Sequence, residues 1–248
     1  MFFDEHPEFL ETSTTANDRG RLNLRHEAII TDNLDVLTGA RVLDIASHDA
    51  RWTFAALQAG AAHVTSVEGR AGLVEASRST LTAKAVDPER YDLVHGDVYD
   101  VLAREDYQVD VVMCLGFLYH TLRYNELLHG IRATGAQHVI VDSKVMPGVR
   151  EPTVRMVTDQ NVVKSMAIAD RYSFGGKSLV GLPSAPAIRR MLATYGYRVE
   201  KRFNWDRLLA KHPDAEYVEK YRSGGRVTLR AVRADRNDVP EGEPIDAG

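Results

Sequence analysis

The sequence predicts an α/β fold in which a mostly parallel sheet is covered by helices on both faces. Five strand-like runs alternate with helix-like segments over about 130 residues, as is typical of parallel sheets with helical crossovers. The runs are almost continuously apolar, as expected for strands that are buried on both faces. With 248 residues, 44% hydrophobic and 27% charged, the chain is long enough for one large α/β domain or two small ones.

Each element follows from its residue pattern. A helix is predicted over 21–37, because apolar residues recur there at helical spacing, and Gly39 ends it. The strand-like runs that follow are 40–46, 62–69, 91–98, 110–120 and 137–145. The helices between and after them are 51–60, 71–86, 123–135 and 184–196. Two runs that alternate like strands, 197–205 and 225–234, flank a polar segment that is expected to be helical.

The regular alternation stops after residue 146. The segment 147–183 has no clean period and is long for a connection, so we expect a lid or a substrate wall there. The polar residues 233–248 are expected to be a disordered tail. The sequence therefore predicts an irregular N-terminal arm over 1–20, one domain over 21–232 that includes the insertion, and the tail.

Charge and composition indicate which binding partners and which cellular compartment to expect. The net charge is -4 and the chain shows no broad basic region, which makes a nucleic-acid partner unlikely. The single cysteine, Cys114, excludes an intrachain disulfide and a cysteine-built metal site. The N-terminus does not read as a signal peptide, and no apolar run reaches the ~20 residues of a membrane span, so we expect a cytoplasmic protein without a membrane partner. The oligomeric state is open, with a homodimer among the alternatives.

Acidic residues stand at the ends of three consecutive predicted strands. Asp44 ends the first, Glu68 the second and Asp97, followed by Val98, the third. Ligands of open α/β sheets bind at the carboxyl ends of the strands, where such acids can accept hydrogen bonds from ribose hydroxyls or a base. Each acid also has a structural alternative: a helix cap for Asp44, a solvated side chain for Glu68 and a turn for Asp97.

This pattern resembles the class I S-adenosylmethionine-dependent methyltransferases over roughly residues 20 to 232. The resemblance rests on VLDIASHDARWTFAAL, VTSVEG, VHGDV and DVVMCLGFLYHT. It implies a Rossmann-like, seven-stranded, mostly parallel sheet with an antiparallel last strand, and S-adenosyl-L-methionine as cofactor. The residues that it implies for the cofactor are Asp44, Ala46 and Ser47 at the methionine end, Glu68 with Gly69 at the ribose, Asp97 with Val98 at the adenine, and Cys114 with Leu115, through backbone groups, along the fourth strand. Arg51 could meet the cofactor carboxylate or be a solvated charge.

The first loop departs from the family pattern. The family commonly has glycines where this chain has Ala46, Ser47, His48, Asp49 and Ala50. A methyl donor of this type has no pyrophosphate, which is the group that most demands bare backbone amides. Ala and Ser would permit close approach of the donor if their φ angles are negative.

The stretch GFLYHTLRYNELL resembles a subset of this superfamily that contains small-molecule methyltransferases and the enzymes that carboxymethylate the wobble uridine of transfer RNA. The resemblance places His120 near the transferred group, where a neutral imidazole could act as a general base. Tyr119 would form a substrate wall, and Asp142 would orient a base or bind substrate. Packing or structural roles remain alternatives for all three. Arg19, Arg21 and Arg25 could close over a carboxylate or form a solvated helix face.

We therefore predict an enzyme that methylates an oxygen or nitrogen of a small molecule, with His120, Tyr119 and Asp142 as catalytic residues and no metal. The first alternative is a transfer-RNA (carboxy)methyltransferase. The second is a non-catalytic protein that binds the cofactor and serves as an interaction partner. The sequence does not specify the acceptor, because substrate choice depends on the arm and the insertion, which carry no recognisable chemical signature.

Overall fold

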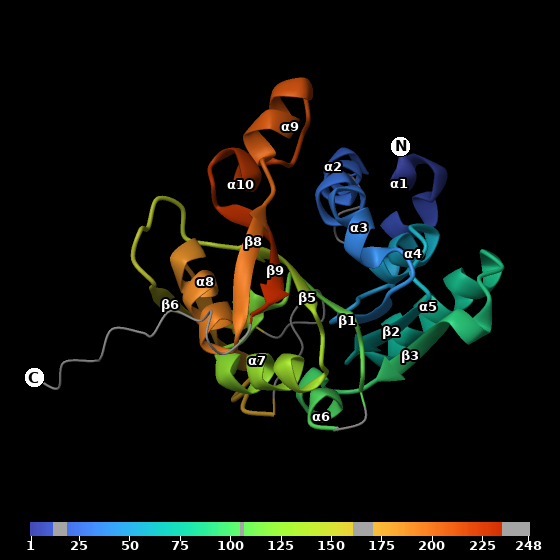
Figure 1. Ribbon diagram of the computed structural model, residues 1–248, viewed down its shortest axis with the longest axis horizontal. Coiled ribbons are helices and arrows are strands. Elements are labelled where there is room, and N and C mark those ends of the chain that lie inside the picture. The colour runs from blue at the N-terminus through green and yellow to red at the C-terminus, as the bar shows by residue number, and fades with distance from the viewer. Residues whose placement is uncertain (12–18, 105–106, 161–170, 235–248) are drawn as a thin grey trace, which may run out of the picture.

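The computed structural model describes residues 1–11, 19–104, 107–160 and 171–234, and its centre is a seven-stranded sheet in the order β3-β2-β1-β4-β5-β9-β8 (Figure 1). Its strands are β1 (Arg41–Ile45), β2 (His63–Glu68), β3 (Tyr91–His95), β4 (Val111–Leu115), β5 (His138–Lys144), β8 (Tyr197–Arg202) and β9 (Arg226–Arg233). The helices of the described residues are α1 (Phe2–Glu5), α2 (Arg19–Ile29), α3 (Leu34–Leu37), α4 (Arg51–Gln58), α5 (Ala71–Ala83), α6 (Val98–Leu102), α7 (Tyr124–Ala133), α8 (Ala185–Thr194), α9 (Trp205–Lys211) and α10 (Glu219–Arg222).

The sheet confirms the predicted fold class. β1 pairs in parallel with both β2 and β4, while β3 and β5 extend the sheet in parallel on either side. β9 runs antiparallel to β5 and to β8, so it is the antiparallel strand near one edge. The chain order reverses between β1 and β4, which makes the carboxyl ends of these two strands the switch point at which α/β sheets bind ligands.

Helices cover both faces, and each face has its own apolar core. One core joins the sheet to α6, α7 and α8, and includes Leu43, Leu102, Leu127 and Leu192. The other joins it to the N-terminal helices, α4 and α5, and includes Phe54 and Leu81. The continuous apolar strands are the reason for this arrangement, because both of their faces must be removed from water.

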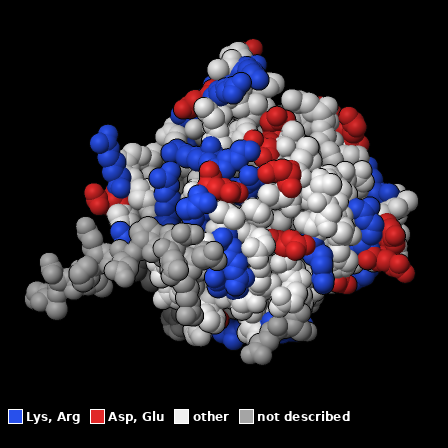
Figure 2. Space-filling model, viewed as in Figure 1, with Lys and Arg blue, Asp and Glu red and all other residues white. Residues whose placement is uncertain are grey.

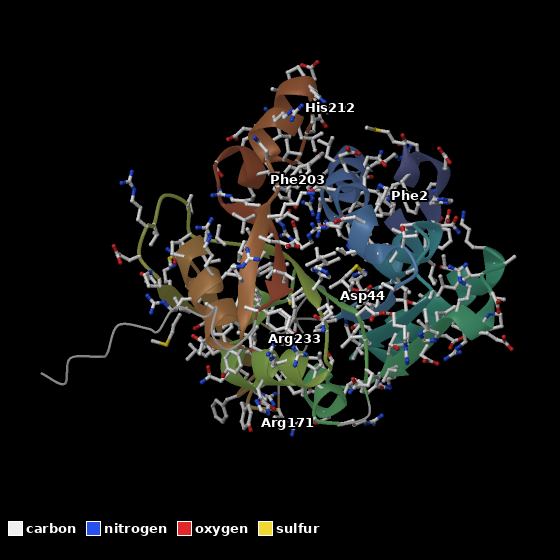
Figure 3. All side chains as sticks on the ribbon, in the orientation of Figure 1. Phe2, Asp44, Arg171, Phe203, His212 and Arg233 are labelled. Atoms are coloured by element: carbon white, nitrogen blue, oxygen red, sulfur yellow. The ribbon has the colours of Figure 1, made fainter. Side chains whose placement is uncertain are left out.

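The first eleven residues differ from the irregular arm that the sequence predicts. They form α1 and a 3₁₀ turn, Pro7–Leu10, and the side chains of Phe3 and Phe9 are fully buried against the second core. Phe2 lies beside the N-terminal helices, at some distance from Asp44 in the sheet (Figure 3). Burial of these aromatic rings fixes the start of the chain, and no periodicity in the sequence indicates it. Residues 12–18 of the predicted arm lie outside the described residues.

A two-stranded antiparallel hairpin was not predicted. It consists of β6 (Val154–Gln160) and β7 (Lys177–Pro183), within the segment 147–183 that the sequence suggested as a lid or wall. The hairpin is anchored next to the 3₁₀ turn Leu118–His120, since Gly181 donates its N–H to the carbonyl of Thr121 and accepts a hydrogen bond from the Tyr124 hydroxyl. A Cβ atom at Gly181 would lie 2.3 Å from that hydroxyl, so only glycine permits this close approach.

The C-terminal part adds a small cap. α9 and α10 pack against α2 through a third apolar cluster, in which Trp205 stacks on Tyr221 with ring centroids 3.7 Å apart. Figure 1 shows these two helices beyond one end of β8 and β9, on the side where α2 lies. Within the described ranges, no helix is long and apolar enough to cross a membrane. The predicted tail lies outside the described residues, apart from Arg233 and Ala234.

Candidate functional site

A cavity of about 490 Å³ opens at the carboxyl ends of the parallel strands, at the switch point of the sheet. Its wall comes from α2, from the loops after β1, β2, β3 and β4, and from single residues of β5, β6 and β9. Ten of the predicted site residues line it: Ala46, Ser47, Arg51, Glu68, Gly69, Asp97, Val98, Leu115, Tyr119 and His120. Asp44, Cys114 and Asp142 do not.

The first loop has the backbone of a glycine-rich loop although it has no glycine. Ala46, His48 and Ala50 all have positive φ angles, of 53°, 59° and 59°. The sequence-based condition that the small residues keep negative φ is therefore wrong for Ala46 and Ala50. The left-handed region costs roughly 1–2 kcal/mol per non-glycine residue, so tertiary contacts must hold this loop in shape.

One such contact joins two charged side chains of the loop. Asp49 receives a bidentate hydrogen bond from Arg51, with Nε to Oδ1 at 2.7 Å and Nη2 to Oδ2 at 2.6 Å. Burial alone would raise the pKa of Asp49, but the Arg51 guanidinium holds it well below the usual range. Arg51 is therefore largely committed to Asp49, while still lining the cavity.

Asp44 lies beneath the loop and does not face the cavity. It is 1% exposed and accepts a hydrogen bond of 2.8 Å from Thr53 in α4. Burial raises the pKa of Asp44 to about 7, and the negative charges of Glu68 and Asp49 contribute in the same direction. Asp44 therefore supports the loop from below, which is close to the helix-capping alternative left open by the sequence.

Glu68 ends β2 and faces the cavity directly. Its Oε2 accepts from the backbone N–H of His48 at 2.9 Å, and its Oε1 accepts from the backbone N–H and the Nε of Arg70, each at 3.0 Å. Its side chain is only 4% exposed. A carboxylate at this place can accept hydrogen bonds from two ribose hydroxyls, and it also links the first loop to the second strand.

Asp97 and Val98 form the loop after β3. The side chain of Asp97 caps α6 by accepting from the backbone N–H of Tyr99 at 3.0 Å, and it also lies 3.3 Å from Arg171. The structural alternative for Asp97, a turn acid, is thus present, while both residues still line the cavity. One carboxylate oxygen serves the cap, and the other faces the guanidinium.

The turn after β4 presents Tyr119 and His120. Nδ1 of His120 lies 3.0 Å from Oδ2 of Asp159, a residue of β6 in the hairpin. Burial lowers the pKa of His120, Asp159 opposes this effect, and the nearby Lys144 and Arg226 lower it further. Together these effects place the pKa of His120 below its usual value of 6.5, so its imidazole is mainly neutral at pH 7. Burial would raise the pKa of Tyr119, but Arg226 and Lys144 bring it below its ordinary value.

Asp142 is a buried anchor and not a cavity residue. It stands within β5, is fully buried, and binds Arg25 at 2.9 Å, Arg226 through Nε at 2.7 Å, and the hydroxyls of Thr228 and Tyr221. Burial by itself would raise its pKa, but the two arginines hold it at about 2. The prediction that Asp142 orients a base or contacts substrate is not supported by this placement, because its oxygens are saturated by neighbouring side chains.

The side chains of Cys114 and Leu115, whose backbone groups were predicted to line the cofactor, point to opposite faces of the sheet. Leu115 lines the cavity, but Cys114 faces the opposite side, towards Leu118, Leu128 and Ile188 of the first core. Burial raises the pKa of the Cys114 thiol to about 12, so it is a packing residue. The alternation of side chains along a strand explains why two neighbours cannot share one face.

Three charged residues from later parts of the chain line the cavity without having been predicted: Lys144, Asp159 and Arg226. Arg21 and Arg25, for which the sequence left open either a carboxylate partner or a solvated helix face, also line the cavity, and the side chain of Arg25 is 9% exposed. The place of Lys144 at the end of the fifth strand could have indicated it. Asp159 and Arg226 offered no such indication, because they come from the unpredicted hairpin and from an antiparallel strand. Among the residues that the structure describes, no group of three His, Cys, Asp or Glu could hold a metal ion.

Comparison with known proteins agrees with this geometry. A family model described as a methyltransferase domain matches residues 42–134, which contain the first four strands of the sheet. No curated protein matches the sequence.

Solved structures share the fold at low identity. A candidate S-adenosylmethionine-dependent methyltransferase from Listeria monocytogenes is 14% identical, with a TM-score of 0.59 over 85% of this chain and 98% of that one. The 1,6-didemethyltoxoflavin-N1-methyltransferase of Burkholderia thailandensis, solved with 1,6-didemethyltoxoflavin and S-adenosylhomocysteine, is 17% identical, with a TM-score of 0.57 over 85% and 77%. A candidate RNA methyltransferase from Pyrococcus horikoshii is 13% identical, with a TM-score of 0.53 over 85% of each chain.

Glu68, Asp97 and the first loop line the cavity at the switch point of the sheet. The matched domain covers these same elements, and the similar structures extend the fold over most of the chain. Residues 42–134 therefore match a methyltransferase domain, and the chain has the fold of the S-adenosylmethionine-dependent methyltransferases.

Proposed function

We propose that this methyltransferase acts on an oxygen or nitrogen of a small molecule, with His120 as the general base. The observation that carries the proposal is the contact between His120 and Asp159 at the wall of the cavity. Asp159 accepts a hydrogen bond from Nδ1, which fixes the neutral tautomer and leaves the lone pair on Nε2. A base of this kind is useful where the acceptor must lose a proton during the transfer.

For the donor, we propose that Glu68 binds the ribose, that Asp97 and Val98 contact the adenine, and that the loop from Ala46 to Arg51 surrounds the methionine part. When bound, S-adenosylmethionine supplies an electrophilic methyl group on a sulfonium. The residues of this chain hold the acceptor in line with that group and exclude water from the cavity. His120 takes the proton that the acceptor loses as it bonds to the methyl carbon.

A small acceptor is favoured over RNA by the shape and charge of the molecule. The cavity is lined by α2, the hairpin and the loops of the sheet edge, and its volume of about 490 Å³ lies in the range of small-molecule sites. On the face drawn in Figure 2, the Lys and Arg that gather left of the centre have Asp and Glu among and beside them, so this region is of mixed charge. The net charge of the chain is -4, whereas RNA binding rests on clustered Lys and Arg in excess.

The proposal is tested by a radiolabelled methyl-transfer screen against fractionated metabolites, followed by identification of the labelled product. His120→Ala should lower the rate of transfer by about 10²- to 10⁴-fold while leaving the affinity for S-adenosylhomocysteine within about twofold. His129→Ala, at an exposed position of α7, is the matched histidine control and should transfer at the parent rate.

Three outcomes would contradict the proposal. Transfer by His120→Ala at the parent rate would exclude the base. Label found only in transfer RNA, together with a salt-dependent mobility shift, would indicate an RNA substrate. Tight binding of the cofactor with no labelled product in any fraction would indicate a non-catalytic binding protein.

A further inference from the structure

On one side of the cavity, the buried positive charges of the described residues outnumber the buried negative charges that pair with them. Arg25 and Arg226 both line it, and each has a side chain that is only 9% exposed. Both arginines bind the same carboxylate, that of Asp142, so two buried cations share one anion. A buried charge without a partner is costly, and a surplus of one charge therefore favours a ligand that brings an anion.

One polar atom in this group is left without a hydrogen bond. The Nε of Arg25 is buried and has no partner within the described residues, although Nη2 of the same guanidinium binds Asp142. The guanidinium of Arg25 lies over the ring of Trp52, 5.0 Å from its centroid, which restricts its orientation. The charge of a preorganised arginine whose hydrogen bonding is incomplete is only partly compensated, which favours an anion beside it in the cavity.

Lys144 and Tyr119 complete the surroundings. Lys144 pairs in register with Arg226 across β5 and β9, and its Nζ lies 4.7 Å from the ring centre of Tyr119. The Tyr119 hydroxyl lies 3.4 Å from Nη1 of Arg226. The ammonium group of Lys144 and the hydroxyl group of Tyr119 are thus two further donors beside the arginines.

The acids of this side do not balance its cations. Asp142 lies beneath the two arginines, and Asp159 is engaged with His120, which is neutral at pH 7. Among the residues that the structure describes on this side, Arg25, Arg226 and Lys144 therefore outnumber the carboxylates of Asp142 and Asp159, and Arg21 of α2 also lines the cavity.

The order of strands in the sheet separates Lys144 and Arg226 from the elements proposed to hold the donor. Glu68 and Asp97 follow β2 and β3, and the first loop follows β1, all on one side of the switch point. Lys144 and Arg226 stand on β5 and β9, two and three strands away from β1, which corresponds to roughly 10 and 14 Å at the usual strand spacing. Lys144 and Arg226 thus lie on the acceptor side, and Arg25 is joined to Arg226 through Asp142.

We propose that the methyl acceptor carries a carboxylate, which binds to Arg25, Lys144 and Arg226. This inference rests on the proposed function, since it assigns the acceptor of that same site. The two oxygens of a carboxylate match the fork of N–H groups that an arginine presents. Asp142 is then a positioning residue that holds the two arginines in the wall, and Tyr119 can donate its hydroxyl proton to the same group.

Binding of simple acids tests the proposal without knowledge of the natural acceptor. Benzoate, 4-hydroxybenzoate and inorganic phosphate are titrated into the protein saturated with S-adenosylhomocysteine, beside the neutral benzamide and 4-hydroxybenzamide. We expect the carboxylates to bind at least about tenfold more tightly than their amides, because one buried charged hydrogen bond contributes about that much.

Variants test whether the acids bind at Arg25, Lys144 and Arg226. Lys144→Gln should weaken carboxylate binding about fivefold, and Arg226→Lys should weaken it further. Lys220→Gln, at an exposed position of α10, removes the same charge outside the cavity lining and should change nothing.

The affinity for S-adenosylhomocysteine, measured on the same variants, separates the two sources of a carboxylate. It should stay within about twofold of the parent in Lys144→Gln. An equal loss of S-adenosylhomocysteine affinity would overturn the proposal, because the cluster would then bind the carboxylate of the donor. Equal binding of acids and amides, tighter binding of phosphate than of carboxylate, or no saturable binding of any acid would also overturn it. Failure of methyl transfer alongside tight acid binding would instead refute only the proposed function.

Discussion

Two buried aspartates on strands β1 and β5 have opposite pKa shifts, and they characterise the two halves of the cavity. Asp44, below the donor-side loop, has its pKa raised to about 7 by burial and by neighbouring acids. Asp142, below the acceptor side, has its pKa held at about 2 by Arg226 and Arg25, against the effect of burial. The donor side is therefore rich in acids and the acceptor side rich in cations. This matches the proposed placement of a donor with a positive sulfonium on the first side and of an acceptor with a negative group on the second.

The two halves also differ in how the chain builds them. The donor half comes from one continuous segment, from Ala46 to Val98, in which the lining residues follow successive strands. The acceptor half joins five separate parts of the sequence, which contribute Arg25, His120, Lys144, Asp159 and Arg226. Forming the first half requires only the parallel strands and their loops, while the second depends on the docking of α2, the hairpin and β9.

The largest effect is expected at the anchor of the acceptor half. Asp142→Ala leaves Arg25 and Arg226 buried without their shared anion, so we expect the free energy of unfolding to fall by about 3–5 kcal/mol. Urea unfolding followed by circular dichroism measures it. Asp35→Ala is the matched control, because its exposed carboxylate binds Arg230, and its loss should change stability by less than about 1 kcal/mol. Equal losses in the two variants would mean that the buried cluster is not an anchor.

The pH dependence of stability gives a second readout. The pKa of Asp142 in the folded state lies below its ordinary value of 3.8, so its contribution is present above pH 4 and is lost as pH falls towards 2. The raised pKa of Asp44 has the opposite sign: its contribution is greatest below pH 4 and is lost as pH rises towards 7. Asp44→Asn should therefore flatten the stability profile between pH 4 and 7, while Asp142→Asn should flatten it below pH 4. Unchanged profiles in urea titrations across this range would contradict both assignments.

The next effect is expected where the hairpin meets the acceptor half. Asp159→Asn keeps the shape of the side chain but removes the charge that favours the correct tautomer of His120. We expect the rate of transfer to fall by about 10- to 100-fold, with little change in cofactor affinity. Because Asp159 raises the pKa of His120, the acidic limb of the pH–rate profile should move to lower pH in the variant. An unshifted limb at a normal rate would show that the hairpin only covers the site.

A smaller effect is expected at the ribose acid of the donor half. Glu68→Gln keeps the size of the side chain but weakens its hydrogen bonds, so affinity for S-adenosylhomocysteine should fall about tenfold in isothermal titration. Glu75→Gln, at an exposed position of α5, is the control. Parent-like affinity in Glu68→Gln would remove Glu68 from the donor site, whereas a loss of acid binding without a loss of cofactor affinity would place it on the acceptor side.

The smallest effect concerns the first loop. Ala46→Gly relieves the positive φ of this residue but increases the entropy of the unfolded chain, so the free energy of unfolding should rise by less than about 1 kcal/mol. Ala76→Gly, in the middle of α5, should lower it by about 0.5–1 kcal/mol. A destabilised Ala46→Gly would mean that the methyl group of Ala46 contributes more through packing than its backbone conformation costs.

The sequence indicates more of the cavity lining in the donor half than in the acceptor half. Glu68, Asp97 and Val98 could be placed at the cavity because they end apolar strands, and a parallel sheet brings such ends to one edge. Asp142 does not line the cavity, because an acid near the end of a run can point into the core as readily as into a site. The hairpin was missed, since β6 is largely exposed and has no alternating pattern of burial.

The sequence by itself determined the order of strands and helices, the parallel sheet and the edge at which its strands end. These features follow from apolar periodicity and from residues at strand ends, which are local properties of the chain. Only the tertiary structure decided that Asp159 reaches His120, that Arg25 is buried, and that Asp142 serves both Arg25 and Arg226. The physical reason is that charge pairing depends on distance in space, and these partners are 39, 117 and 84 residues apart along the chain.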